Sequence, residues 1–155
     1  DWASVQSVGI NNRLANPGTP TYQRWHEAVI AYYGDRQPAH GAIWLTYYPN
    51  IMVEWYPHSL AVSTLVPRGP EACTNVVEFY YPEDIAFFER EFVEAEQAAY
   101  RETAIEDAEI IERMTAGRRA LLQQGLVETG PYQSPLEDGM RHFHEFVRRE
   151  IEPHL

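Results

Sequence analysis

The feature that most constrains the fold is a run of four short β-rich segments in the middle of the chain. Turns that contain proline separate them, and they cover residues 42–48, 51–56, 60–66 and 74–81. Parallel strands need a long crossover between them, so strands joined by such short turns pair in antiparallel fashion. The sequence therefore predicts an antiparallel meander with one face on a core and the other face less buried.

Helical periodicity lies on both sides of this run. Thr19 offers an N-cap, Pro20 fits the first turn, and apolar residues then recur at helical spacing until Gly34. A long helix is predicted after Pro82, with an apolar stripe that is expected to face the sheet: Phe88, Phe92, Ala95, Ala99, Thr103, Ile110 and Met114. We expect Gly117 to bend or end this helix.

The two ends of the chain differ in their patterns. Residues 1–18 carry no sustained period, begin without a methionine, and are predicted to be a lead-in whose partner elements lie upstream. Residues 136–151 carry a helical pattern and are predicted to form the last helix. With 155 residues in total, the chain is predicted to be a single domain.

The composition excludes several partners and chemistries. All 12 basic residues are arginines, and 23 acidic residues give a formal net charge of −11, so neither nucleic acid nor an anionic membrane is expected as a partner. The absence of lysine removes Schiff-base chemistry. No apolar run approaches the ~18 residues of a membrane helix, no signal peptide is apparent, and the lone Cys73 cannot form an internal disulfide. These features predict a cytoplasmic protein.

Two carboxylates interrupt the apolar stripe of the long helix. After Thr103 the next inward positions carry Glu106 and Asp107, and Ile110 then resumes the stripe. A carboxylate beside a buried stripe needs an ionic partner, a proton or a metal ion, because its desolvation is costly. The alternative, in which both carboxylates reach water at the edge of the stripe, stays open at this point.

The six histidines do not form a metal-binding pattern by themselves. None has another histidine three or four residues away, the spacing that places two ligands on one helix face. His142 and His144 are two residues apart, so they point to roughly opposite faces of the last helix. Glu137 and Asp138 nearby are only a weak signal for acid–base groups. Each histidine alone is predicted to be structural or to lie on the surface.

Several blocks of sequence resemble one known family. The chain resembles the C-terminal catalytic domain of Rieske non-haem iron oxygenase α subunits, the aromatic ring-hydroxylating dioxygenases, from about residue 22 to residue 148. The blocks that carry the resemblance are residues 43–57, 75–82, 106–110 and 130–139, together with His142-Phe143-His144. The match rests on these blocks together, which makes it more specific than any single motif.

The resemblance implies a fold and a metal site. The implied fold class is α+β, with a helix-grip (START-like) antiparallel sheet around a long C-terminal helix, incomplete at its N-terminus here. In this family two histidines of an Asp-x-x-His-x-x-x-x-His motif and one carboxylate hold a mononuclear Fe(II), which leaves positions open for oxygen and substrate. The carboxylate comes from a Glu-Asp pair on the long helix. The resemblance therefore implies Asp107 as the metal ligand, with Glu106 as the fallback.

The chain departs from the family pattern in two places. It has no His-x-x-x-x-His pair, and it lacks the Cys-x-His and Cys-x-x-His pairs that hold the Rieske two-iron two-sulfur cluster. The sequence therefore resembles the second half of a catalytic domain, with the Rieske domain absent. Because one carboxylate cannot hold ferrous iron tightly in water, this polypeptide alone is predicted to have no oxygenase activity.

For the intact enzyme, the resemblance implies a redox chain and a substrate class. Electrons pass from NAD(P)H through a ferredoxin or flavin reductase to the Rieske cluster and then to the iron, where O2 is used to hydroxylate or oxidatively demethylate a small molecule. Members of the family are commonly trimers. An apolar or aromatic substrate is expected on the concave face of the sheet, with these candidate lining residues: Trp44, Tyr47, Met52, Trp55 and Phe79. Met52 and Trp55 lie on opposite faces of a regular strand, so at least one of the five is expected to be misplaced.

Two other classes of function stay open at this point. A metal-free helix-grip module would use the same cavity to bind an apolar ligand. A scaffold or assembly subunit would bury its exposed aromatic surface against other copies. An oxygenase needs the missing histidines in the same polypeptide, whereas a binding module does not.

Overall fold

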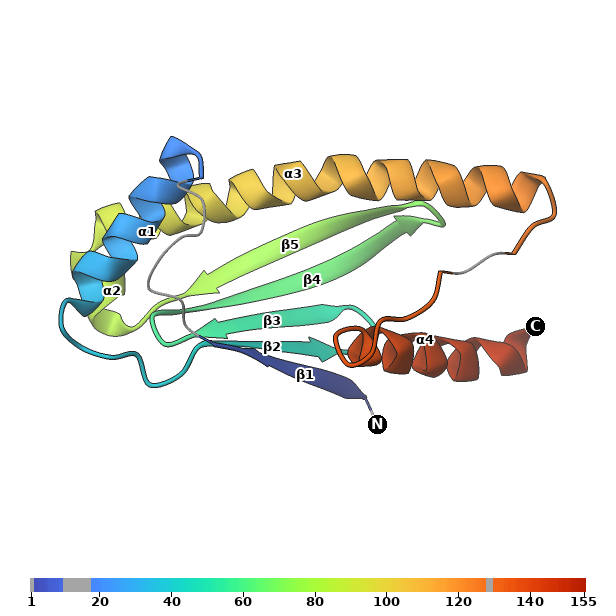
Figure 1. Cartoon of the computed structure of the whole chain (residues 1–155), viewed down its shortest axis with the longest axis horizontal. Helices are drawn as coiled ribbons and strands as arrows, with labels where there is room; N and C mark the ends of the chain where they lie inside the picture. Colours follow the sequence, from blue (N-terminus) through green and yellow to red (C-terminus); the bar gives the residue numbers. More distant parts are fainter. Residues whose placement is uncertain (1, 10–17, 128–129) are drawn as a thin grey trace. The chain divides into compact units, whose positions relative to one another are not determined.

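A computed structural model describes residues 2–9, 18–127 and 130–155, which fall into two compact units (Figure 1). The first unit contains the described parts of residues 1–10, 39–81 and 130–155. The second unit contains the described parts of residues 11–38 and 82–129. In the part of the chain that the structure describes, no helix has the length and apolar character needed to span a membrane.

The first unit is built on a five-stranded sheet with the order β1-β2-β3-β4-β5, in which every neighbouring pair is antiparallel (Figure 1). The predicted meander is therefore confirmed for its four expected strands. The bounds of the strands are Ala3–Val8 for β1, Ala42–Tyr47 for β2, Ile51–Tyr56 for β3, Ser59–Gly69 for β4 and Ala72–Tyr80 for β5. Strand β4 runs on through Pro67, which was expected to lie in a turn.

Strand β1 corrects the interpretation of the N-terminal segment as a lead-in with upstream partners. It pairs with β2 from Ala3 opposite Tyr47 to Val8 opposite Ala42, so its partner lies downstream in the same unit. Its short sequence, Ala-Ser-Val-Gln-Ser-Val, has no clear hydrophobic alternation, and no turn joins it directly to β2, so local signals did not reveal it. Residues 10–17 of the predicted lead-in lie outside the described residues.

The last helix of the first unit, α4, spans Asp138–Ile151 and packs against β1, followed by the short 3₁₀ helix Glu152–His154. An aromatic cluster anchors it. Tyr48, which is only 2% exposed, has its ring 5.1 Å from the rings of both Phe143 and Phe146. Trp2 meets Phe146 edge to face at 5.2 Å. These contacts fix α4 to one end of the sheet.

Within its described residues, the second unit contains three helices: α1 at Pro20–Tyr33, α2 at Glu83–Phe88 and α3 at Arg90–Gln123. The predicted first helix and its cap are confirmed, because the Thr19 hydroxyl accepts a hydrogen bond from the Tyr22 backbone N–H at 3.3 Å. Helices α1 and α3 pack against each other. The long helix predicted after Pro82 is instead divided into α2 and α3.

The division falls at Glu89, whose φ of −115° and ψ of 54° are not helical. Beyond that point α3 continues through Gly117, so the expectation that the helix ends at this glycine is wrong. The helix ends before Gly125, which has a φ of +71°, a conformation that glycine adopts without strain.

The apolar stripe predicted along the long helix is only partly buried. Phe92, Ala95 and Ala99 are buried, whereas Phe88, Ile110 and Met114 are 81%, 55% and 54% exposed. Only the part of the predicted stripe near the start of α3 is therefore buried. A helix of 14 residues such as α1 is about 21 Å long and a helix of 34 residues such as α3 is about 51 Å long, so α1 can cover less than half of α3.

Candidate active site

The strand register assigns the side chains of the sheet to two faces. Residues paired across neighbouring strands share a face, and successive residues along a strand alternate between faces. One row runs from Trp44 through Glu54 and Ala61 to Phe79. We call the face that carries this row, with Met52 and Tyr56 on the same side of β3, the Trp44 face. The opposite face, which carries Tyr47, Trp55, Val76 and Tyr80, is the Trp55 face.

The register divides the five predicted lining residues between these faces. Trp44, Met52 and Phe79 lie on the Trp44 face. Tyr47 and Trp55 lie on the Trp55 face. At most three of the five can therefore line one cavity over the sheet, as the opposite orientation of Met52 and Trp55 predicts.

The two faces also differ in their exposure to solvent. On the Trp44 face, Ser59, Ala61 and Ser63 are 3%, 4% and 2% exposed. Four large side chains of the Trp55 face, Tyr47, Trp55, Val76 and Tyr80, are 44% to 50% exposed, against 39% and 37% for Trp44 and Met52 on the Trp44 face. The Trp44 face is therefore the better protected of the two, above all along β4, and it is the candidate surface for holding a small molecule.

A carboxylate lies among the aromatic side chains of the Trp44 face. Glu54 is half-buried and stands directly opposite Trp44 on the neighbouring strand. The Tyr56 hydroxyl donates a hydrogen bond to Glu54 Oε2 at 3.2 Å. This bond fixes the orientation of the carboxylate from the same strand.

A buried histidine supports Tyr56 from the next turn. The His58 ring stacks on the Tyr56 ring with centroids 5.5 Å apart and planes 23° apart, and His58 is 5% exposed. Burial lowers the pKa of His58 to about 4, so its ring is neutral at pH 7. A neutral ring adds no positive charge beside the Glu54 carboxylate.

Sequence reasoning did not identify Glu54 as a candidate site residue. The period-2 alternation of β3 already placed it on one face with Met52 and Tyr56. Its neighbours from β2 and β5 became apparent only through the register. A single acidic residue at an inward strand position between aromatic residues is the local signal that could have pointed to it.

The predicted metal ligand Asp107 and its fallback Glu106 both lie exposed on α3. Their exposure agrees with the alternative in which both reach water. Among the residues whose placement is described, no group of three or more His, Cys, Asp or Glu side chains could hold a metal ion. The described residues therefore do not by themselves fit a mononuclear iron, and Asp107 stays a predicted ligand.

The two histidines of α4 are engaged in hydrogen bonds with tyrosines. His142 Nδ1 lies 3.1 Å from the Tyr48 hydroxyl, and His144 Nδ1 lies 2.6 Å from the Tyr132 hydroxyl. These contacts agree with the prediction that each histidine alone is structural or on the surface.

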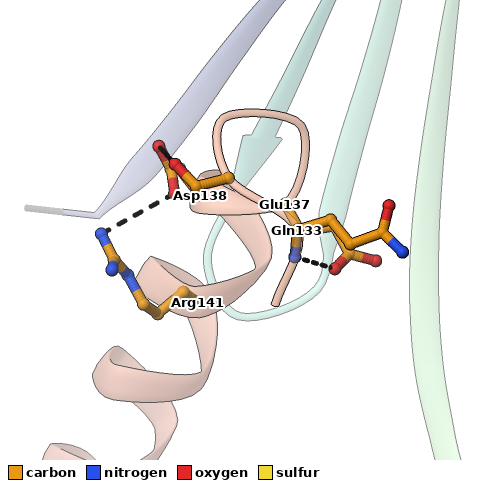
Figure 2. A network of polar contacts seen from close by, with 5 residues as sticks. Gln133, Glu137, Asp138 and Arg141 are labelled. Atoms are coloured by element: carbon orange, nitrogen blue, oxygen red, sulfur yellow. Dashed lines mark hydrogen bonds and ion pairs between the residues drawn. The ribbon is translucent and has the colours of Figure 1, made fainter. Parts of the chain in front are cut away.

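The carboxylates of Glu137 and Asp138 stabilise the first turn of α4 and the loop before it through local polar contacts (Figure 2). Glu137 Oε2 accepts a hydrogen bond from the Gln133 backbone N–H at 2.6 Å. Asp138 forms an ion pair with Arg141 at 3.8 Å and accepts a hydrogen bond from the Ser134 hydroxyl at 3.2 Å. These contacts explain the acidic pair by local structure rather than by acid–base chemistry.

Comparison with known proteins gives a family match and several relatives. A family model described as the ring hydroxylating alpha subunit (catalytic domain) matches residues 1–152. The chain is 64% identical over 152 residues to a putrescine 2-hydroxylase of Ralstonia nicotianae, which covers 98% of this chain and 42% of that protein. It is 58% identical over 149 residues to a putrescine 2-hydroxylase of Bordetella bronchiseptica, which covers 96% of this chain and 35% of that protein.

A more distant relative is the chloroplastic choline monooxygenase of Atriplex hortensis, 31% identical over 104 residues, which are 67% of this chain and 23% of that protein. No solved structure matches the chain. The chain spans about two-fifths of the length of the Ralstonia relative.

Proposed function

Because this chain belongs to the family of ring-hydroxylating α-subunit catalytic domains, we propose that it forms the C-terminal portion of a Rieske-type oxygenase catalytic domain that hydroxylates an aliphatic amine. The observation that carries the proposal is the 64% identity, over 98% of the chain, to a putrescine 2-hydroxylase. The family match and the five-stranded antiparallel sheet confirm the predicted α+β helix-grip class. In this proposal residues 1–155 belong to one catalytic domain, and the Rieske domain comes from other residues of the α subunit.

The proposed substrate differs from the apolar or aromatic compound expected from the resemblance, which is not confirmed. Putrescine is a diamine that is protonated at neutral pH, and choline carries a quaternary ammonium group, so the named substrates of the relatives are cations. The chain carries a formal net charge of −11, which attracts cations to its surface. The aromatic side chains of the Trp44 face also suit a cation, because the faces of their rings are electron-rich.

The proposed metal site needs two histidine ligands in addition to the side chains of the described residues. We propose that Asp107 supplies the carboxylate of a two-histidine, one-carboxylate site for Fe(II), whose histidines lie elsewhere in the α subunit. Iron in such a site supplies the activation of O2. On this account the 155-residue chain alone is inactive, and the full-length enzyme draws electrons from a reductase and assembles as a cytoplasmic homotrimer.

A substrate panel tests the proposal. The full-length α subunit is supplied with its reductase, NAD(P)H and O2, and it is offered putrescine, choline and an apolar aromatic compound in parallel. The proposal predicts that putrescine gains one oxygen atom, detected by mass spectrometry, and that the aromatic compound does not react. Hydroxylation of the aromatic compound with no reaction of either amine would contradict it.

A further inference from the structure

We propose that Glu54 binds an ammonium group of the substrate beside the rings of Trp44 and Tyr56, and that Phe79 lines the site of the carbon chain. This inference rests on the proposed function for its substrate class. Beyond the proposed function, it names the carboxylate that binds the substrate, Glu54, and the face of the sheet on which the substrate lies, the Trp44 face.

The register places these residues on one face of the sheet, on strands β2, β3 and β5, whose order is seen in Figure 1. Trp44 on β2 lies directly opposite Glu54 on β3, and Phe79 on β5 lies in the same row two strands further on. Neighbouring strands are about 4.8 Å apart, so the backbones at Glu54 and Phe79 are separated by roughly 10 Å. The row has its smallest side chain, Ala61, between them. A short aliphatic chain would therefore extend from the carboxylate towards the aromatic wall of β5.

That wall consists of two rings rather than one. The Phe79 and Tyr81 rings are stacked, with centroids 6.4 Å apart and planes 9° apart. Two aromatic rings provide apolar surface for the methylene groups of an amine. The β5 side of the Trp44 face is therefore suited to the carbon chain of an amine, while Glu54 is suited to its ammonium group.

Glu54 differs from its neighbours on the Trp44 face because it is charged. Among the paired strand positions of the described sheet, Glu54 is the only charged residue on the Trp44 face, and Glu78 is the only one on the Trp55 face. A carboxylate forms strong, charge-assisted hydrogen bonds with an ammonium group, and these bonds strengthen where water is restricted. Glu54 meets this condition because it is half-buried on the protected face, whereas Glu78 is exposed.

Tyr56 and His58 are positioning residues for this carboxylate. The Tyr56 hydroxyl donates to Glu54 Oε2, and the buried His58 ring stacks on Tyr56. An oriented carboxylate loses less conformational freedom when the ligand binds. His58, in the turn after β3, therefore holds the Tyr56 ring, and Tyr56 in turn orients the Glu54 carboxylate on the Trp44 face.

The decisive variant is Glu54→Gln in the full-length oxygenase. The amide oxygen of glutamine can still accept the hydrogen bond from Tyr56, so the local structure is kept while the negative charge is lost. We expect the KM for putrescine to rise about 10- to 100-fold, which is the range for losing a hydrogen bond to a charged group, with a much smaller change in kcat. Glu54→Asp should recover part of the affinity, and Tyr56→Phe should raise KM by a few-fold.

Glu78→Gln is the matched control, because it removes the same charge from the opposite face of the sheet. It should leave KM within about twofold of the unmodified enzyme, since an exposed charge is screened by water and salt. The inference is overturned if Glu54→Gln leaves KM unchanged, or if Glu78→Gln raises it equally.

A binding measurement separates this inference from the proposed function. Calorimetry with putrescine, in the absence of the reductase, measures affinity without turnover. If the unmodified enzyme binds putrescine but does not hydroxylate it, the proposed reaction fails, and loss of binding in Glu54→Gln still supports the ammonium site. If the unmodified enzyme does not bind putrescine, the ammonium site is overturned as well.

Discussion

The hydroxyl of Tyr48, which follows strand β2, lies 3.1 Å from Nδ1 of His142 in helix α4. Tyr48 is 2% exposed, so this bond joins a buried side chain at the end of the sheet to a partly buried histidine of the last helix. The same helix carries the polar network at its first turn (Figure 2). The sheet of the candidate site is thus held at one end by a buried aromatic cluster.

Tyr48→Phe should lower the free energy of unfolding by about 1 kcal/mol, because it removes this hydrogen bond while keeping the ring contacts. Chemical denaturation followed by circular dichroism measures the change. Tyr132→Phe is the control, because Tyr132 makes a comparable bond to His144 but is 38% exposed. An equal loss of unfolding free energy in both variants would show that the stabilisation by the Tyr48 hydrogen bond does not depend on its burial.

Thr19→Ala should destabilise α1 by about 1 kcal/mol, because the Thr19 hydroxyl caps the helix by accepting from the Tyr22 N–H. The hydroxyl also donates a hydrogen bond to the Glu102 carboxylate on α3. Thr19→Ser keeps both contacts and should restore most of the stability. Thermal unfolding of both variants checks the prediction, and a serine variant as unstable as the alanine variant would contradict the capping role.

Stability should depend on pH through His58. Its pKa is lowered by burial to about 4 in the folded state, against about 6.5 when it is exposed, so between these values the unfolded chain binds more protons. The stabilisation is complete above about pH 6.5 and declines as the pH falls towards 4, by up to about 3 kcal/mol.

The measurement is the denaturation midpoint of the protein and of His58→Gln across this range. Glutamine does not titrate, so the variant should show a shallower slope between pH 6.5 and pH 4. Parallel slopes in the two proteins would refute the assignment to His58.

Asp107→Ala in the full-length α subunit should abolish retention of the mononuclear iron and turnover, while the absorption of the Rieske cluster stays intact. Because Asp107 is exposed on α3, the substitution should change folding stability by less than about 0.5 kcal/mol. Iron content by elemental analysis is the readout, and Glu106→Ala is the control. If Asp107→Ala keeps its iron and Glu106→Ala loses it, the ligand is the neighbouring glutamate.

Local patterns in the sequence predicted most of the secondary structure. Strands β2 to β5 and helix α1 carry strong periods and clear boundary residues, and the predictions agree closely with the structure. Strand β1 was missed because its sequence carries no clear period of its own. The segment forms a strand by pairing with β2, which is distant in sequence. Neither the break at Glu89 nor the continuation of α3 through the exposed Gly117 was predicted from the local sequence.

The candidate site could be predicted only in part. Alternation along β3 separated Met52 from Trp55, but the row that joins Trp44, Glu54 and Phe79 depends on the register between strands. A shift of the register by one residue would move each of these side chains to the other face. The role proposed for Glu54 therefore required the pairing of the strands as well as the sequence.

The most direct test of the account is oxygen isotope labelling with putrescine as the substrate. The full-length enzyme, with its reductase and NAD(P)H, is incubated under ¹⁸O2, and the product is analysed by mass spectrometry. We expect hydroxylated putrescine that carries one labelled oxygen atom, and no product from Asp107→Ala. Product without the label, or consumption of NAD(P)H and oxygen with putrescine recovered unchanged, would contradict it.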